Sequence, residues 1–161
     1  VFCVEWAVGE EPFVVLLADD FLIVEGVGTT ADFAYANTNF GKSQISVILV
    51  VNVGILKYVL FRPRPVLGHI AELVEKPLLY DAASELGSVG CYLLMPGVFE
   101  ILRSQGLLYD GETQLSDAIT TLAAREGLYY VSLSCLRFDC GSVDAYAILP
   151  YHIVDRELHK F

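Results

Sequence analysis

Short runs of hydrophobic residues that do not alternate with polar ones are the feature that most constrains the fold of this 161-residue chain. The clearest is residues 13–17 (FVVLL), which ends in Ala18, Asp19 and Asp20. Runs of this length are typical of strands that are covered by helices on both faces, as in parallel sheets. We therefore expect an α/β fold with a mixed, mostly parallel sheet flanked by helices.

Strand-like and helix-like segments alternate along the rest of the chain. We expect strands at 13–17, 45–51, 55–61, 70–74, 89–94 and 129–133, and helices at 31–39, 96–104, 116–127 and from 143 onward, the last one broken near Pro150. Thr29 or Thr30 is the expected N-cap of the first helix, Ser116 that of the third, and Gly127 ends the third. No repeat or linker divides the chain, so we expect one domain over residues 1–161.

The most hydrophobic segment, residues 45–61, is shorter than the roughly 20 residues that a transmembrane helix needs. Asn52, Gly54 and Lys57 interrupt it, and its many β-branched residues favour buried strands over a helix. Gly54 would then mark a bend or bulge between two strands. We expect no association with a membrane.

Composition excludes several classes of protein. Hydrophobic residues make up 55% of the chain, which is too many for an intrinsically disordered protein. The chain has 20 acidic and 10 basic side chains, a net charge of −10, so it lacks the basic surface that a nucleic-acid partner requires. Its four cysteines have no CxxC spacing and follow no secretory signal, which favours reduced thiols in a cytoplasmic protein. Because the chain begins at Val1 and not at Met, we expect a piece of a longer protein.

Carboxylates at strand ends are the first candidates for chemistry. Asp19 and Asp20 follow a buried strand, where ligands bind in open α/β sheets, and Asp139 follows another strand-like run close to Gly141. Two carboxylates from two strand ends can hold Mg²⁺ and leave coordination positions for substrate phosphates. The alternative is that these aspartates only cap the loops that follow, and the sequence alone leaves both interpretations open.

Three further motifs are weaker. Glu75 and Lys76 could bind sugar hydroxyls and a phosphate, although an exposed ion pair before Pro77 is favoured on spacing alone. The glycine-containing segment 26–30 lacks the third glycine of a dinucleotide site and the Gly-Lys-Ser/Thr end of a P-loop, so a loop with a helix cap explains it better. The three histidines have no recognisable catalytic partner.

Four motifs then occur in a familiar order. They are Glu-Pro-Phe-Val-Val-Leu-Leu-Ala-Asp-Asp (11–20), Val-Glu-Lys-Pro (74–77), Gly-Glu-Thr-Gln-Leu-Ser-Asp-Ala-Ile (111–119) and Phe-Asp-Cys-Gly-Ser (138–142). Together they resemble bacterial UTP–glucose-1-phosphate uridylyltransferases, which are sugar-nucleotide pyrophosphorylases. The resemblance runs from about residue 2 to 152 and covers the C-terminal half to three-fifths of that family's chain. The family's N-terminal strand and Gly-x-Gly-Thr-Arg loop have no counterpart in the 161 residues.

The resemblance implies a fold, a reaction and a set of residue roles. The fold is a partial Rossmann-like nucleotide-diphospho-sugar transferase, and the reaction converts UTP and glucose 1-phosphate to UDP-glucose and pyrophosphate with magnesium. Asp19 and Asp139 would hold the metal, and Asp19 and Lys76 would be catalytic. The implied substrate-binding residues are Glu75 for glucose hydroxyls, Lys76 for the sugar phosphate, and Gly90, Gly111, Glu112 and Gln114, with Asp117 in the same signature as the last three.

Departures from the family pattern leave two hypotheses open. The family reads Gly where this chain has Val59 and Asn where it has Glu85, and many relatives have Lys in place of Val143. A β-branched side chain would intrude on the sugar, and a carboxylate would repel its phosphate. The chain is therefore either part of a uridylyltransferase, inactive by itself, or a diverged or truncated non-catalytic relative that acts as a binding or interaction module. Association into a homo-oligomer is left open.

Overall fold

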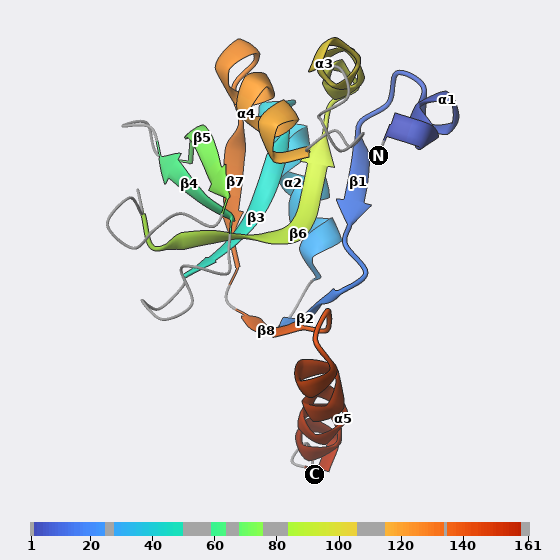
Figure 1. Cartoon of the computed structure of the whole chain (residues 1–161), viewed down its shortest axis with the longest axis vertical. Coiled ribbons are helices and arrows are strands. Elements are labelled where there is room, and N and C mark those ends of the chain that lie inside the picture. Colours follow the sequence, from blue (N-terminus) through green and yellow to red (C-terminus); the bar gives the residue numbers. More distant parts are fainter. Residues whose placement is uncertain are drawn as a thin grey trace.

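A sheet with helices on both faces forms the body of the molecule (Figure 1). The computed structural model describes residues 2–24, 28–49, 59–63, 68–75, 84–105, 115–133 and 135–158. The strands are β1 (Phe13–Leu16), β2 (Asp20–Val24), β3 (Gln44–Leu49), β4 (Val59–Pro63), β5 (Ile70–Glu75), β6 (Leu86–Leu94), β7 (Tyr129–Ser132) and β8 (Cys135–Asp139). The helices are a 3₁₀ turn at Phe2–Val4, α1 (Glu5–Val8), α2 (Thr29–Phe40), α3 (Gly97–Gln105), α4 (Leu115–Arg125) and α5 (Val143–Leu158).

The long strand β6 is the centre of the main sheet, whose order is β5-β4-β6-β3-β7. On one side β6 pairs with β3. On the other side its first half pairs with β4, at Gly87 and Ser88, and its second half pairs with β1, from Cys91 to Leu94. The partner on that side of β6 therefore changes around Gly90. Strands β2 and β8 form a separate two-stranded sheet, called the β2–β8 ribbon below.

The expectation of an α/β fold with a mixed sheet flanked by helices is confirmed, but the expectation of a mostly parallel sheet is wrong for the described residues. Among the described strands only β3 and β7 pair in parallel, while β1, β3 and β4 each pair with β6 in antiparallel register. Unalternating hydrophobic runs report burial on both faces, and β6 is buried almost throughout although its neighbours are antiparallel. Such a run therefore indicates a covered strand and not the direction of its partners.

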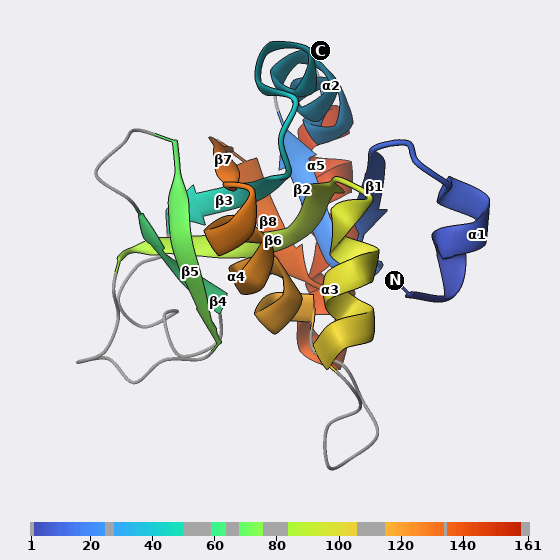
Figure 2. The ribbon, with the colours of Figure 1, turned by 90° about the horizontal axis from the view of Figure 1, so that it is seen from above.

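The two faces of the sheet have separate hydrophobic clusters, as side-chain alternation along β6 requires. Tyr92 and Leu94 pack with α3 and α4, in a cluster that includes Phe99 and Leu122. Cys91, in contrast, packs toward Phe33 of α2, with Leu93 beside it. Seen from above, α3 and α4 lie on one side of β6 and α2 lies on the other (Figure 2).

All four expected helices are present, with corrections at their ends. The N-cap of α2 is Gly28 and not a threonine, since both threonines already have helical backbone, and Ser116 lies inside the first turn of α4. Gly127 follows α4 with φ of 85°, the left-handed conformation that a glycine adopts readily after a helix. The expected break at Pro150 is wrong, because α5 continues through it and gives up one backbone hydrogen bond there. Strands β2 and β8 had no counterpart among the expected elements.

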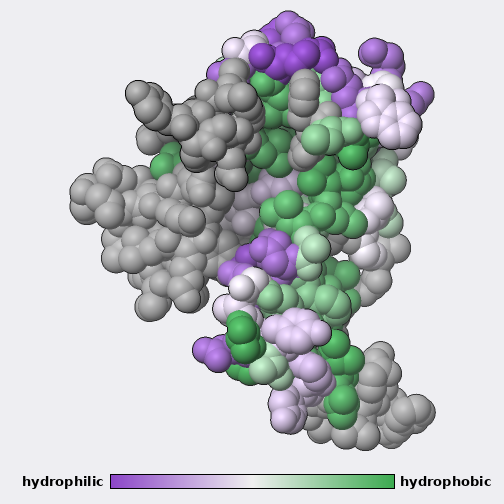
Figure 3. Space-filling view, turned by 45° about the vertical axis from the view of Figure 1, so that its right-hand side comes forward, coloured by the Kyte–Doolittle hydropathy of each residue, from purple (hydrophilic) through white to green (hydrophobic). Residues whose placement is uncertain are grey.

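Helix α5 extends from the body and packs on β8 (Figure 1). Several of its large hydrophobic side chains are exposed, among them Val143, Tyr146, Tyr151 and Val154, whereas Leu149 is buried. Further exposed hydrophobic residues lie at the end of β1 and at Phe21, and Figure 3 shows hydrophobic side chains gathered down the middle of this side of the molecule. Among the described residues, β1 pairs on one side only, with β6.

The segment 45–61 contributes to β3 and β4, as its β-branched residues predicted. Residues 50–58, with the expected bend at Gly54, lie outside the described residues. In the described part of the chain, no helix is both long enough and hydrophobic enough to span a bilayer. All four cysteines are free thiols, as expected.

Truncation of Leu122 tests the packing of α4 on the sheet. Leu122 is fully buried, so Leu122→Ala should lower the free energy of unfolding by about 3 kcal/mol, measured by urea denaturation followed by circular dichroism. The neighbouring Thr121 is exposed, and Thr121→Ala should change it by less than about 0.5 kcal/mol. Equal losses in the two variants would contradict this packing.

Candidate functional site

The β2–β8 ribbon brings together two acidic segments that are far apart in the sequence. Asp20, the first residue of β2, pairs in antiparallel register with Asp139, the last residue of β8. Beyond this pair, the backbone N–H of Cys140 donates a hydrogen bond of 2.6 Å to the carbonyl oxygen of Asp19. The expected convergence of Asp19 and Asp139 is therefore present, produced by an antiparallel ribbon and not by the ends of parallel strands.

The carboxylates of Asp19 and Asp139 face a common point beside Gly141. A Cβ atom placed on Gly141 would lie 3.1 Å from Oδ1 of Asp139 and 3.4 Å from Oδ2 of Asp19. Both aspartates are exposed, and the N–H of Gly141 donates to Oδ1 of Asp139 over 3.2 Å. Hard carboxylate oxygens that converge on an open space fit Mg²⁺, which needs few protein ligands and keeps positions for water and phosphate. Among the described residues, no group of three or more acidic, histidine or cysteine side chains could hold a metal.

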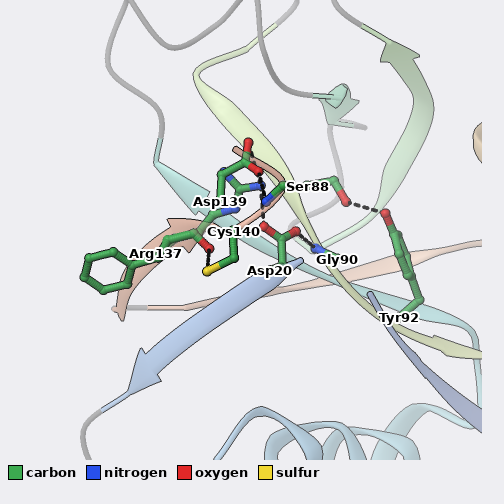
Figure 4. A network of polar contacts seen from close by, with 9 residues as sticks. Asp20, Ser88, Gly90, Tyr92, Arg137, Asp139 and Cys140 are labelled. Atoms are coloured by element: carbon green, nitrogen blue, oxygen red, sulfur yellow. Dashed lines mark hydrogen bonds and ion pairs between the residues drawn. The ribbon is translucent and has the colours of Figure 1, made fainter. Parts of the chain in front are cut away.

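Asp20, next to Asp19 in sequence, has a different environment. Its side chain is only 6% exposed, its Oδ1 forms an ion pair with Nη2 of Arg137, and its Oδ2 accepts a hydrogen bond of 2.6 Å from the N–H of Gly90 (Figure 4). Both oxygens are thus engaged within the protein. Of the two adjacent aspartates, Asp19 is the one available to a ligand, and Asp20 has a structural role.

Gly90 lies where β6 changes its partner, and the backbone there has an unusual environment. The N–H of Leu17 donates a hydrogen bond of 2.7 Å to the carbonyl oxygen of Gly90, and the chain then turns away from β6. The N–H of Gly90 donates instead to the carboxylate of Asp20. A Cβ on Gly90 would lie 2.6 Å from Cβ of Leu17 and 2.7 Å from Oδ2 of Asp20. Only glycine fits this close approach. Gly90 itself is buried, and its N–H is bound by Asp20. Its substrate-binding role, which the resemblance implies, therefore stays a prediction.

The expected sugar-binding residue Glu75 is the last residue of β5. It pairs with Val59 of β4, and Val59 pairs with Ser88 of β6, so the three residues form one row across the sheet. At about 4.8 Å per strand, Glu75 lies roughly 10 Å from Ser88, which is two residues from Gly90. The row that contains Glu75 therefore crosses β6 two residues from Gly90, which Asp20 of the ribbon contacts. Val59, a departure from the family pattern, lies between them.

The other expected site residues are placed only in part. Lys76, Gly111, Glu112 and Gln114 lie outside the described residues. Asp117 lies in the first turn of α4 and is exposed. Glu85 and Val143, the other two departures from the family pattern, are also exposed.

Arg137 was not among the site residues expected from the sequence. It lies two residues before Asp139, so the two side chains share one face of β8, and Nη2 of Arg137 lies 4.0 Å from Oδ2 of Asp139. The two-residue spacing is visible in the sequence, but it places the two side chains on one face only if residues 135–139 form a strand, and no strand was expected there.

Burial changes the chemistry of two side chains beside the site. Desolvation, with the nearby Asp20 carboxylate, raises the pKa of the Cys91 thiol from 9.0 to about 11. Burial likewise raises the pKa of Tyr92, against the hydrogen bond with Ser88 that lowers it (Figure 4). Neither group is ionised at neutral pH.

Alkylation should distinguish the cysteines. Because the thiolate is the nucleophile, iodoacetamide at pH 8 should modify the exposed Cys3 and leave Cys91 unmodified until the chain is unfolded, as measured by peptide mass spectrometry. The higher pKa in the folded chain also means that the contribution of Cys91 to stability is complete below pH 9 and is lost as the pH rises toward 11. Modification of native Cys91 at the rate of Cys3 would contradict this assignment.

Serine substitution tests the close approach at Gly90. Gly90→Ser should lower the free energy of unfolding by about 1–3 kcal/mol, because the new side chain overlaps Leu17 and Asp20. In the control Gly28→Ser, the added Cβ meets nothing within 4 Å and serine is a good N-cap, so stability should be unchanged or slightly higher. Thermal unfolding of both variants measures the difference, and a stable Gly90→Ser variant would refute the packing described.

The chain is similar to known proteins in sequence. The nucleotidyl transferase family model matches residues 1–154. The UTP–glucose-1-phosphate uridylyltransferase YngB of Bacillus subtilis is 31% identical over 144 residues, which are 88% of this chain and 48% of that protein. UTP–glucose-1-phosphate uridylyltransferase 2 of Staphylococcus saprophyticus is 33% identical over 158 residues, 94% of this chain and 54% of that protein.

Solved structures show the same similarity in three dimensions. A crystal structure of apo UDP-glucose pyrophosphorylase superposes with a TM-score of 0.89 at 30% identity, covering 97% of this chain and 59% of that one. A UDP-glucose pyrophosphorylase complexed with UDP-glucose gives 0.87 at 30% identity, covering 96% and 60%. The chain thus spans about half the length of its curated relatives, which is the share that the sequence motifs predicted.

Proposed function

We propose a function on the premise that the chain belongs to the nucleotidyl transferase family. The chain would supply the metal-binding and sugar-phosphate-binding part of an enzyme that converts UTP and glucose 1-phosphate to UDP-glucose and pyrophosphate. The names of its relatives support this choice of substrates. Since the chain spans about half of their length, the complete reaction needs residues beyond those that match here.

The observation that carries the proposal is the convergence of Asp19 and Asp139 beside Gly141. In the proposed site these two carboxylates would hold Mg²⁺, which when bound supplies positive charge to the phosphates of UTP and to the departing pyrophosphate. A protein with a net charge of −10 repels such substrates, so an acidic chain can bind them only where cations offset its own charge.

The chain's own residues would act by positioning. Glu75 would accept hydrogen bonds from the glucose hydroxyls, and Lys76 would neutralise the sugar phosphate whose oxygen attacks the α-phosphorus of UTP. The row from Glu75 through Val59 to Ser88, which ends two residues from Gly90, supports a sugar position near the contact between β6 and the ribbon. Gly90 would keep the turn at Asp19 close to β6, and Gly111, Glu112 and Gln114 would shape the sugar site.

A second function has its own support. Val59 lies in the row between Glu75 and Ser88, where the family has glycine, and the exposed Glu85 adds negative charge where the family has asparagine. The valine side chain would intrude on the sugar and the carboxylate would repel its phosphate, so both changes would weaken binding. A chain that kept the fold and lost catalysis would act as a binding module.

Residence in the cytoplasm and association with further copies are proposals that we carry over from the sequence. Free thiols and relatives that use nucleotide substrates support the first. The exposed hydrophobic residues of α5 support the second.

A chimera tests the proposed reaction. The segment of Bacillus subtilis YngB that matches this chain would be replaced by residues 1–161, and pyrophosphate release measured with UTP, glucose 1-phosphate and Mg²⁺. The chimera should be active, and Asp19→Asn and Asp139→Asn should each reduce its rate by roughly 100-fold, since each removes charge that stabilises the transferring phosphate. The exposed Glu10 provides the control, Glu10→Gln, which should leave the rate unchanged.

The isolated chain should release no pyrophosphate under the same conditions. Release that Asp19→Ala abolishes would overturn this expectation of inactivity. A folded chimera without activity would reject the uridylyltransferase proposal and favour the non-catalytic binding module.

A further inference from the structure

Arg137 lies between two carboxylates, of which one is buried and the other is half-exposed. Its Nη2 forms an ion pair with Oδ1 of the buried Asp20 and lies 4.0 Å from Oδ2 of the half-exposed Asp139 (Figure 4). The Arg137 side chain is 14% exposed, so water screens these charges less than on an open surface. One cation is thus within reach of both a structural aspartate and a proposed metal ligand.

We propose that Asp20 is a positioning residue that holds Arg137 away from Asp139 and so leaves Asp139 available to a divalent cation. This inference rests on the proposed function, because it assigns Asp19 and Asp139 to the metal. It adds that the neighbouring acidic residue acts through an arginine and not as a third ligand.

The geometry of Asp20 separates two tasks. Oδ2 accepts the N–H of Gly90, a task that a neutral asparagine oxygen also performs. Oδ1 pairs with Arg137, a task that requires the negative charge. Asp20→Asn therefore keeps the acceptor for β6 and removes the partner of the guanidinium.

Loss of that partner has a definite consequence. Asp139 is the second carboxylate that Arg137 reaches, on the same face of β8, so the guanidinium would shorten this 4.0 Å ion pair to direct contact. An ion pair at Asp139 competes with a bound cation for the same oxygens. Without Asp20, the metal site is weakened although both proposed ligands remain.

Titration with Mn²⁺, followed by the electron paramagnetic resonance signal of the unbound ion, tests the proposal on the full chain without any enzymatic reaction. Asp139→Asn first defines the binding that belongs to the proposed site. We expect Asp20→Asn to weaken that binding about tenfold, the effect of one nearby ion pair on a partly exposed carboxylate. Competition with Mg²⁺ should show the same ratio.

A double variant separates positioning from a merely structural role. In Asp20→Asn/Arg137→Met no guanidinium faces Asp139, so Mn²⁺ binding should return to within about twofold of the original chain. A structural role for Asp20 predicts that the double variant binds no better than the single one. The matched control is the exposed pair Glu100 and Arg125, 3.4 Å apart, where Glu100→Gln/Arg125→Met should leave binding unchanged.

Each outcome decides between the two claims. If the original chain has no binding that Asp139→Asn removes, the metal assignment and this inference both fail. If that binding exists but Asp20→Asn does not weaken it, or the double variant does not restore it, this inference alone fails. If Asp20→Asn does not fold, as judged by circular dichroism, the double variant decides: binding as tight as in the original chain supports the proposal, and binding tenfold weaker overturns it.

Discussion

One buried carboxylate joins the two sheets of this molecule. Asp20 accepts a hydrogen bond from the backbone N–H of Gly90, at the point where the pairing partner of β6 changes from β4 to β1. It also forms an ion pair with Arg137 of the ribbon. A buried backbone N–H needs an acceptor, and a buried carboxylate needs a counter-charge. Asp20 meets the first need and Arg137 the second. The turn at Asp19 and the end of β8 are held against the main sheet by this arrangement.

The candidate site follows from the same constraint. With Asp20 committed to Gly90 and Arg137, the register of the ribbon leaves Asp19 and Asp139 exposed at its end, facing Gly141. Two neighbouring residues of the same type thus have opposite environments, one buried and paired, the other open to ligands. This difference allows an acidic chain to present a defined pair of oxygen ligands instead of a diffuse negative surface.

Much of the fold could be predicted from the sequence, because hydrophobic runs and helix stops are local signals. Strand β1, helix α2 and the turn at Gly127 are found near the expected residues. The direction of strand pairing could not be predicted, since it depends on contacts between distant segments. Strand β8 was missed because it is short and mixes polar with hydrophobic residues, and the hydrophobic run of β2 was expected to be part of a loop after Asp20. Without these strands the sequence identifies Asp19 and Asp139 as candidate ligands but does not show that they lie close together. For the same reason it gave Arg137 no recognisable role.

Nuclear magnetic resonance of the ¹⁵N-labelled chain during a Mg²⁺ titration tests the central claim most directly, that Asp19 and Asp139 form one cation site. The claim predicts saturable shifts concentrated at the amides of Asp19, Cys140 and Gly141, which come from both segments of the ribbon and report on the same ion. Shifts confined to one of the two segments, or spread over the acidic surface without saturation, would contradict it.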